Sequence, residues 1–523
     1  MHVNPSLSGP LSPGLSLLQP GWRGHVLVLL AGLALPLSLA PFDIWPLSLA
    51  CPALLAWTLQ HLDGRQAMWR SFWFGLGMYG SGASWVIVSI SGYGGAPLPL
   101  ALLLTGIFIL FLAAVFSLPF YLLGRWLRAG PANLVLGFSG CWILGEWLRS
   151  WLFTGFPWLY IGYAHIDTWL AGWAPVAGIF GVGLACTLSA ALLAAATGLP
   201  QRRALLCLAL IAPLWLAGWG LQKPQWTQTI DRPLTVGMAQ GNIPQELKWA
   251  PSFLQPTLQR YRDMSEPLWQ HDWVVWPEAA VPLLFHDAGP YLEEMHEKAS
   301  ATDTALITGI LFDDYFRQVN PEPAYYNSII GLGQGSGIYH KRRLVPFGEY
   351  VPLDRYLRGL IAFFDLPTSI IDAGPDGQPG LRAGAYRLAP FICYEVVYPD
   401  LVAASAATSH ALITISNDAW FGDSIGPIQH LQMAQMRALE TGRYLIRATN
   451  NGVSAIVDRR GRILHRSEQF VQQTLSGEIA AVVGTTPFMR WGSAPVIALC
   501  LGLLALGLIG ARRFNSPPAY GAD

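Results

Sequence analysis

The sequence has 523 residues, of which 52% are hydrophobic and only 12% are charged, and its 32 basic and 32 acidic side chains leave no net charge. A soluble domain of ordinary composition carries about 25% charged residues, so much of this chain is expected to lie outside water. The balanced charge argues against nucleic acid as a partner, because nucleic-acid binding favours a basic face.

Apolar runs close to the length that crosses a hydrocarbon core of about 30 Å recur along the chain. They cover residues 24–41, 44–60, 71–91, 97–123, 132–154, 169–198, 203–220 and 491–511. These runs predict a polytopic α-helical membrane bundle of about eight spans, with a re-entrant pair as the alternative for the first two. Many of the 22 tryptophans stand near the ends of the runs, as in a membrane-interface belt.

Basic residues in the short loops predict the orientation of the bundle. They stand before the first run, in alternate loops and after the last run: Arg23, Arg65, Arg70, Arg125, Arg128, Arg202, Arg203, Arg512 and Arg513. The intervening loops have none, so both termini are expected in the cytoplasm and the long insert on the opposite side, which in a bacterium is the periplasm. The predicted domains are residues 1–220 in the membrane with about seven helices, 221–490 exported, and 491–523 as a last span and tail.

The insert has a different pattern, with short apolar runs separated by turns. The runs at 234–240, 273–279, 305–311, 326–332, 389–395 and 411–418 predict buried strands, and 252–270, 289–301 and 426–442 predict helices. Strands that alternate with helices indicate a layered α/β domain.

Cys393 is the one cysteine of the exported part, since the other five lie in apolar runs. An unpaired thiol in an oxidising compartment is exposed to disulfide exchange and oxidation, which serine or alanine would avoid. We therefore predict that Cys393 has a chemical function and does not merely pack.

Three strand ends carry residues that support a cysteine nucleophile: Glu278 in "WPEAAVP", Lys341 and Glu349 in "YHKRRLVPFGEYVP", and Cys393 in "FICYE". A thiol nucleophile needs a base for its proton and a positive group for the tetrahedral oxyanion. Each residue also has a structural alternative: a helix cap for Glu278, a solvated basic run for Lys341, and a turn for Glu349. No metal or cofactor is expected, because histidines such as His286 and His430 lack metal-ligand spacing.

The ordered set "WPE", "HKRRLVPFGE" and "CYE" resembles the nitrilase, or carbon–nitrogen hydrolase, superfamily with its Glu–Lys–Cys triad. With "QGNIPQELKW", "SNDAWFGDSIGP", "TNNGVSA" and the membrane-half segment "TGFPWL", the chain resembles the bacterial apolipoprotein N-acyltransferase family over most of its length. The resemblance implies an α-β-β-α sandwich for the exported domain and a location in the bacterial inner membrane.

The resemblance also implies the reaction. A cysteine thiolate takes the sn-1 acyl chain of a phospholipid, typically phosphatidylethanolamine, as a thioester, and the α-amine of a diacylglyceryl-cysteine apolipoprotein then accepts it. By position, the family's base, oxyanion-stabilising lysine and nucleophile fall on Glu278, Lys341 and Cys393. Its supporting residues fall on Glu349, Tyr394, Glu395 and Trp249, and Glu395 has a structural ion pair as its alternative.

The segment 353–371 is apolar and aromatic although it lies between polar motifs of the exported domain. Tyr356, Leu360, Phe363 and Phe364 have helix-like spacing, and ordinary core packing is one interpretation. The other, which we favour, is a lipid-facing arm that covers the acyl chains at the bilayer surface.

Glu146 and Arg149 are ionisable residues inside a predicted span, where such groups are costly. Their i, i+3 spacing favours a structural pair on one helix face, with anchoring of the exported domain as the alternative.

Two other functions compete with the acyltransferase. A membrane-tethered amidase or nitrilase would use the same triad, and water would resolve its thioester. A transporter or envelope scaffold with a degenerate domain would need no triad, and no internal symmetry of the transporter kind is found in the sequence.

Overall fold

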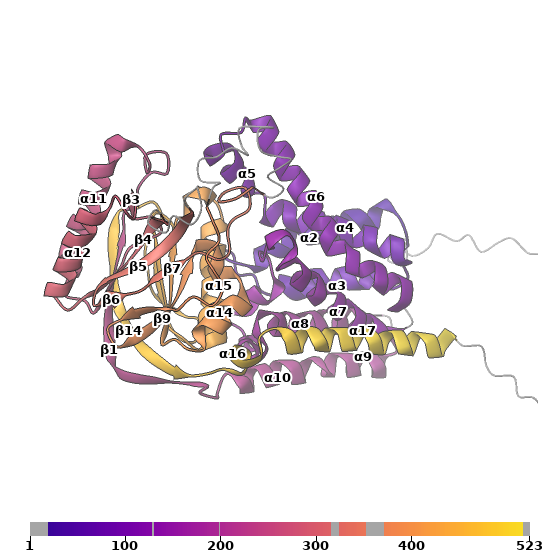
Figure 1. Cartoon of the computed structure of the whole chain (residues 1–523). Coiled ribbons are helices and arrows are strands. Elements are labelled where there is room, and N and C mark those ends of the chain that lie inside the picture. Colours follow the sequence, from indigo (N-terminus) through magenta and orange to yellow (C-terminus); the bar gives the residue numbers. More distant parts are fainter. Residues whose placement is uncertain (1–18, 128–129, 198, 315–323, 352–370, 516–523) are drawn as a thin grey trace, which may run out of the picture.

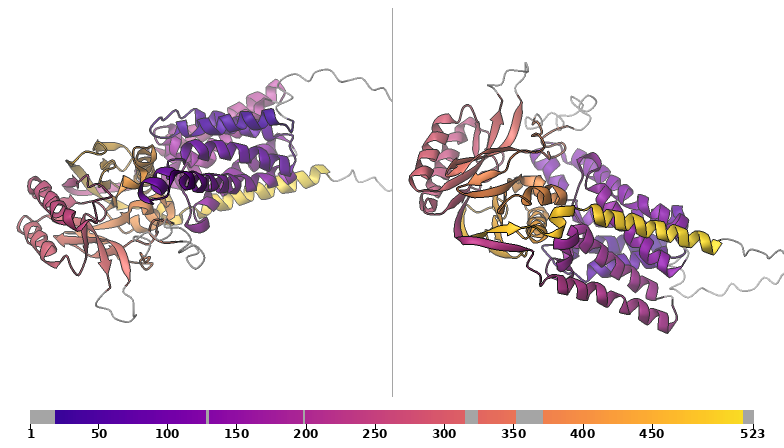
Figure 2. Two further views of the ribbon diagram at one scale, coloured as in Figure 1. Left: turned by 90° about the horizontal axis from the view of Figure 1, so that it is seen from above. Right: turned by 60° about the horizontal axis from the view of Figure 1, so that its bottom comes forward.

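The computed structural model describes residues 19–127, 130–197, 199–314, 324–351 and 371–515. A helical half and an α/β half lie end to end, and the last helix returns to the helical half (Figure 1). Two further views show the same arrangement (Figure 2). The arm residues Tyr356, Leu360, Phe363 and Phe364 lie outside the described residues, so the arm stays a prediction.

The helical half has a helix at every predicted apolar run. Its main helices are α2 (Trp22–Ala34), α3 (Leu47–Leu59), α4 (Gly64–Gly82), α6 (Leu98–Leu122), α7 (Pro131–Arg149), α8 (Ala174–Ala196), α9 (Gln201–Ala209), α10 (Ile211–Leu221) and α17 (Ala494–Asn515). Among the described residues, three helical stretches are long and apolar enough to cross a membrane: Leu98–Leu127, Trp169–Ala196 and Gln201–Leu221. The number of eight spans therefore stays a prediction.

Glycines bring α2 and α4 into close contact. A Cβ atom on Gly32 would lie 2.1 Å from the Phe74 carbonyl oxygen, and one on Gly77 would lie 2.3 Å from that of Leu29. Small residues at such positions let two helix backbones approach each other, which is how helices associate where lipid removes the hydrophobic driving force.

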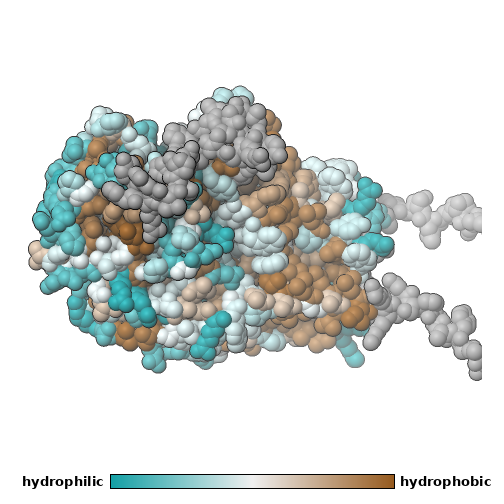
Figure 3. All heavy atoms as spheres, in the orientation of Figure 1, coloured by the Kyte–Doolittle hydropathy of each residue, from teal (hydrophilic) through white to brown (hydrophobic). Residues whose placement is uncertain are grey.

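The surface of the two halves differs in polarity. Side chains over the helical half form a largely apolar band, whereas the α/β half is mixed and mostly polar (Figure 3). The stretch Gln201–Leu221 is the least covered, with only 6% of its apolar window buried inside the protein. Such a helix is expected to face lipid.

The α/β half has two seven-stranded sheets that pack face to face. The first has the order β14-β1-β2-β4-β5-β7 with β3 beside β4, and the second has the order β13-β12-β11-β10-β9-β8-β6. Their strands are β1 (Thr227–Gln240), β2 (Trp273–Val275), β3 (Val281–Leu284), β4 (Ala305–Asp313), β5 (Tyr325–Gly333), β6 (Gly335–Ser336), β7 (Ile338–His340), β8 (Leu381–Ala383), β9 (Tyr386–Ile392), β10 (Ala411–Ser416), β11 (Leu445–Thr449), β12 (Ala455–Val457), β13 (Ile463–Arg466) and β14 (Gln473–Gly484).

Helices cover the outer face of each sheet. The helices α11 (Pro251–Ser265) and α12 (Gly289–Ala301) pack on the first sheet, around buried residues such as Tyr261 and Met295. The helices α14 (Pro399–Ala406) and α15 (Gly426–Thr441) lie between the second sheet and the helical half, in one apolar cluster that includes both (Figure 1). The predicted α-β-β-α sandwich and its strands and helices are thus confirmed, with ends shifted by a few residues.

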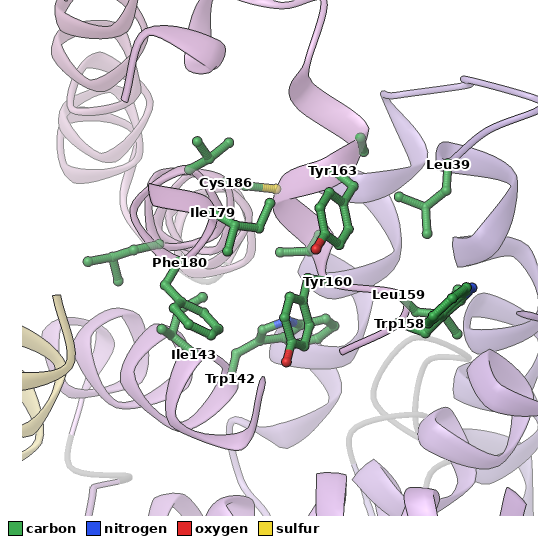
Figure 4. Packing of buried hydrophobic residues seen from close by; sticks show 14 of the residues in the cluster. Leu39, Trp142, Ile143, Trp158, Leu159, Tyr160, Tyr163, Ile179, Phe180 and Cys186 are labelled. Carbon is green, nitrogen blue, oxygen red and sulfur yellow. The ribbon is translucent and has the colours of Figure 1, made fainter. Parts of the chain in front are cut away.

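The core of the helical half forms around the segment after α7. Trp142 and Ile143 of α7, Tyr160 and Tyr163 of this segment, and Phe180 of α8 lie together in one cluster (Figure 4). The rings of Tyr160 and Tyr163 stack with their centroids 5.9 Å apart and their planes 5° apart.

The side chains of Glu146 and Arg149 form hydrogen bonds with the segment after α7 and not with each other. No ion pair between them is found in the described residues; Glu146 accepts hydrogen bonds from Trp142 Nε1 at 3.0 Å and from the Ile161 amide at 2.9 Å. Arg149 donates to the carbonyl oxygens of Phe156 and Trp158. The prediction of an i, i+3 pair is therefore wrong. Backbone groups of the 156–161 segment lack partners in a helix or strand, and they bond to both side chains instead.

Candidate active site

The three residues of the predicted triad lie where strands end. β2 leads into Glu278, β7 leads directly into Lys341, and β9 leads into Cys393. All three side chains are buried, with Lys341 only 1% exposed and Glu278 and Cys393 each 9% exposed. Since β2 and β7 belong to the first sheet and β9 to the second, the site draws on both layers of the sandwich.

Lys341 lies between two carboxylates. Its Nζ atom is 2.8 Å from Glu349 Oε1 and 3.6 Å from Glu278 Oε1. Burial by itself would lower the pKa of Lys341, but the charges of Glu349 and Glu278 outweigh burial and raise it well above its usual value. Lys341 is thus held as a cation, and a buried cation of this kind can stabilise an oxyanion.

Asn327, the third residue of β5, links the two carboxylates. Its Nδ2 atom donates to Glu278 Oε1 at 2.7 Å and to Glu349 Oε1 at 3.0 Å. The Asn417 amide donates to Glu278 Oε2 at 2.8 Å, and the Val345 amide donates to Glu349 Oε2 at 2.9 Å. Each carboxylate is therefore fixed in position before a substrate arrives. The sequence analysis missed Asn327, although a polar residue within an apolar strand was a usable signal.

Cys393 has a backbone conformation that side chains rarely adopt, with φ at +52°. Such local strain persists only where surrounding contacts enforce it, and it concentrates at functional sites. Burial, and then the charge of Glu278, raise the pKa of the Cys393 thiol to about 12, against a smaller opposing effect of Lys341. The resting group is therefore a thiol, and it needs a base at the moment of attack.

Glu395 holds the turn that begins at Cys393. Its carboxylate accepts hydrogen bonds from the Ile392 amide at 2.9 Å, the Arg342 amide at 2.7 Å and the Tyr339 hydroxyl at 2.9 Å. Glu395 thus connects the Cys393 turn to the segment after Lys341, and its partners are backbone amides and a hydroxyl in place of the ion pair considered above.

Tyr394 connects the site to the helical half. Its hydroxyl donates to the Gly155 carbonyl oxygen at 2.9 Å, and its ring stacks on Trp158 with the centroids 6.0 Å apart. Trp158 is fully buried and donates from Nε1 to Gln429 Oε1 at 3.1 Å. The "TGFPWL" segment therefore packs against the turn that carries Cys393 and Tyr394.

His430 supports the Cys393 backbone from the other side. Its Nε2 atom donates to the Cys393 carbonyl oxygen at 3.2 Å, and its Nδ1 atom lies 3.2 Å from Asp418 Oδ1 and 3.0 Å from Arg447 Nη2. Arg447 also donates to Asp418 Oδ2 at 2.7 Å. Within the described residues, no three His, Cys, Asp or Glu side chains come together as a metal site would require.

Lys248 is a second buried lysine at the site, and the sequence analysis passed over it in favour of its neighbour Trp249. Its Nζ atom donates to the Glu278 carbonyl oxygen at 2.9 Å, and the side chain is only 4% exposed. Burial lowers the pKa of Lys248 to about 8, although the charges of Glu278 and Cys393 oppose this effect. Trp249 is 41% exposed, and among the described residues its ring has no hydrogen bond and no stacking partner.

Each half of the chain matches a known protein-family domain. Residues 31–192 match the apolipoprotein N-acyltransferase N-terminal domain, and residues 235–488 match the carbon–nitrogen hydrolase domain. The chain is 48% identical to apolipoprotein N-acyltransferase of Azotobacter vinelandii over 96% of its own length and 98% of that protein. The chain belongs to the apolipoprotein N-acyltransferase family.

Other relatives of this family agree over nearly the whole chain. Identity to the apolipoprotein N-acyltransferase of Pseudomonas aeruginosa strain PAO1 is 49%, covering 94% of this chain and 97% of that one. Identity to the apolipoprotein N-acyltransferase of Coxiella burnetii is 39%, covering 92% of this chain and 99% of that one. The predicted family, and an acyltransferase enzyme with a carbon–nitrogen hydrolase domain, are confirmed.

Solved structures also align with about half of the chain. They include Nit3 of Saccharomyces cerevisiae, with 17% identity, a TM-score of 0.35, and coverage of 48% of this chain and 92% of that one. A carbon–nitrogen hydrolase from Helicobacter pylori G27 has 16% identity, a TM-score of 0.34, and coverage of 54% and 96%.

Proposed function

We propose that this enzyme transfers a fatty acyl chain from the sn-1 position of a phospholipid, phosphatidylethanolamine above all, to the α-amine of the N-terminal diacylglyceryl-cysteine of apolipoproteins. The observation that carries the proposal is the cluster of Lys341, Glu278 and Glu349 beside Cys393, in a chain of this family. The product is a triacylated lipoprotein.

The first step forms an acyl-enzyme. Glu278 takes the proton of the Cys393 thiol as the sulfur attacks the ester carbonyl, and Lys341 stabilises the negative oxygen of the tetrahedral intermediate. Collapse breaks the bond to the glycerol oxygen, which takes the proton from Glu278 and leaves as lysophospholipid. A base in contact with the thiol is needed because burial raises the pKa of Cys393 to about 12.

The second step moves the acyl chain to the lipoprotein. The uncharged α-amine attacks the thioester carbonyl, and Glu278 accepts the proton that the new amide nitrogen loses. Cys393 leaves as the thiolate and recovers its proton from Glu278. An α-amino group has a pKa near 7.7–8.0, so a useful fraction is uncharged at neutral pH. Glu349 keeps Lys341 oriented through both steps.

The enzyme works from the bacterial inner membrane with its α/β domain in the periplasm, in the account we propose. One observation supports this account. The start of α2 and the end of α17 both lie at the end of the bundle that is away from the α/β half (Figure 1). Together with the arginines of the short loops, this favours eight spans, cytoplasmic termini and the domain division at residues 220 and 490. Tyr394 and Trp158 bring the nucleophile to the membrane half, where acyl chains enter.

Product analysis tests the proposal. Purified protein in detergent, given phosphatidylethanolamine and a diacylated lipopeptide, should yield the triacylated lipopeptide and lysophospholipid in equal amounts. Cys393→Ala should yield neither. Free fatty acid as the main product of the wild type would instead indicate a hydrolase.

A further inference from the structure

A groove opens where the α/β half meets the membrane half, away from the triad. It has a volume of about 210 Å³. Its lining includes Trp169, Gln222 and Trp226 from the helical side and its connection to β1, and three arginines from the turn between β12 and β13: Arg459, Arg460 and Arg462.

The arginine turn has a fixed backbone. The Asp458 carboxylate accepts hydrogen bonds from the amides of Arg460 at 2.8 Å and Arg462 at 2.9 Å. Gly461 adopts a positive φ of 78°, and its carbonyl oxygen accepts a hydrogen bond from Gln435 Nε2 at 2.9 Å. The turn is therefore preformed and pinned to α15, so the cost of ordering it on binding is small.

The arginine side chains are available to a ligand. Arg459 donates from Nη1 to the Thr227 carbonyl oxygen at 2.9 Å. Arg460 and Arg462 are exposed, and in the described part of the chain no carboxylate forms an ion pair with either. Asp167 is the acidic residue of the groove lining, so the arginines outnumber it three to one.

The groove continues a lipid-facing surface. The stretch formed by α9 and α10 ends beside it, where α10 reaches Leu221, and the exposed side chains of this stretch include Leu206 at 60%, Leu216 at 53% and Trp219 at 44%. Lys223 lies over the Trp219 ring at 3.7 Å and adds a further cation at this end. Tryptophan and basic side chains at the end of a lipid-exposed helix are suited to the headgroup layer.

Positive charge gathers at this groove. Arg459, Arg460 and Arg462 line it, and Lys223 stands between the lining residues Gln222 and Pro224. Guanidinium groups match phosphate oxygens in geometry and charge.

We propose that this groove binds the phosphate headgroup of an anionic phospholipid of the phosphatidylglycerol class, held as a bound lipid and not as the acyl donor. Strand topology separates it from the triad. Val457 pairs with Leu445 at the start of β11, whereas Cys393 and Asn417 follow the ends of β9 and β10, which run parallel to β11. The groove and the triad therefore lie at opposite edges of the second sheet. The inference rests on the membrane embedding proposed above and not on the acyl-transfer chemistry.

Lipid retention in native mass spectrometry tests this inference. The full-length protein in detergent receives equal amounts of phosphatidylglycerol and phosphatidylcholine with the same chains. The wild type should keep phosphatidylglycerol preferentially. Arg460→Gln with Arg462→Gln should weaken that retention by roughly fivefold for each arginine, as expected for basic residues near an anionic headgroup.

A matched double variant removes the same charge elsewhere. Arg382→Gln with Arg466→Gln changes two exposed arginines outside the groove lining and should keep wild-type retention. Equal losses in both double variants would overturn the inference, as would groove variants that keep phosphatidylglycerol fully. Retention of inorganic phosphate but not of the lipid would also overturn it. Transfer from phosphatidylethanolamine, measured without phosphatidylglycerol, should be unchanged, which separates this test from that of the proposed function.

Discussion

The charged side chains of the site are buried, which lowers the stability of the fold. Glu278, Glu349, Lys341 and Lys248 are buried or nearly so, so two carboxylates and two lysines are held out of water near Cys393. Among the described residues, the Lys248 side chain has a backbone carbonyl as its hydrogen-bond partner, and burying a lysine in this way is expected to lower stability. We therefore infer that the positive charge of Lys248 is kept because it favours the thiolate form of Cys393.

Lys248→Met is expected to be more stable but slower. The pKa of Lys248 falls from 10.5 to about 8 on folding, so at pH 7 the folded protein carries a cost on the order of 3 kcal/mol that disappears above pH ~10.5. Methionine removes this cost, and it also removes a positive charge near Cys393. Acyl-enzyme formation should slow by about tenfold or more. Thermal unfolding and single-turnover rates check this, and a less stable variant with full activity would contradict it.

The protonation state of Cys393 leads to a pH prediction. In Glu278→Gln the base is lost, but burial still keeps the pKa of the thiol above its ordinary value of about 8.5. Alkylation of Cys393 by iodoacetamide should then rise about tenfold per pH unit from pH 7 to 9 without levelling off. Intact mass spectrometry follows the alkylation. A rate that levels off below pH 8 would show that the resting group is already a thiolate.

At the scale of elements, α15 joins the two halves. Its residue Glu440 accepts a hydrogen bond from the Ile179 amide at 2.7 Å, beside the kink that Gly178 makes in α8 with φ at 65°. Arg437 donates to Glu440 at 2.9 Å, and both side chains are fully buried. The same helix carries His430, which donates to the Cys393 carbonyl oxygen, so the packing of α15 on α8 also positions Cys393.

Arg437→Met should destabilise the joint. It leaves the Glu440 carboxylate buried without its cation, which typically costs about 3–5 kcal/mol. Arg437→Met combined with Glu440→Gln removes both charges and should recover most of that loss. The measurement is thermal unfolding of the purified proteins. Equal stability of the single and double variants would show that the pair does not act as a unit.

At the scale of the molecule, the proposed location of the α/β domain in the periplasm can be tested by cysteine labelling. Native cysteines other than Cys207 are buried, so a new surface cysteine can be followed by labelling. In intact spheroplasts, Asp376→Cys should react with a membrane-impermeant maleimide, whereas Gln201→Cys should react only after the membrane is opened. The reverse result would place the α/β domain in the cytoplasm, and wild-type protein gives the background.

Much of this architecture was predictable because its signals are local. Apolar runs predicted the helices, and short apolar strands between turns predicted a layered α/β domain. Strand-end positions pointed to Glu278, Lys341 and Cys393, and the family resemblance supplied the α-β-β-α sandwich. What escaped prediction depends on distant contacts. Trp158 meets Gln429 across 271 residues, and Asn327 acquires its role only when Glu278 and Glu349 fold around it. The Glu146–Arg149 spacing suggested a local pair, but backbone groups of the next segment were the stronger partners.

The acyl-enzyme itself tests the central claim most directly. Wild-type protein is incubated with phosphatidylethanolamine and no acceptor, and its intact mass is compared with those of Cys393→Ala and Glu278→Gln. The account predicts one fatty-acyl increment on the wild type, removed by neutral hydroxylamine, discharged by a diacylated lipopeptide, reduced in Glu278→Gln and absent from Cys393→Ala. An increment that persists in Cys393→Ala, or product formation by that variant, would contradict the assignment of Cys393 as the nucleophile.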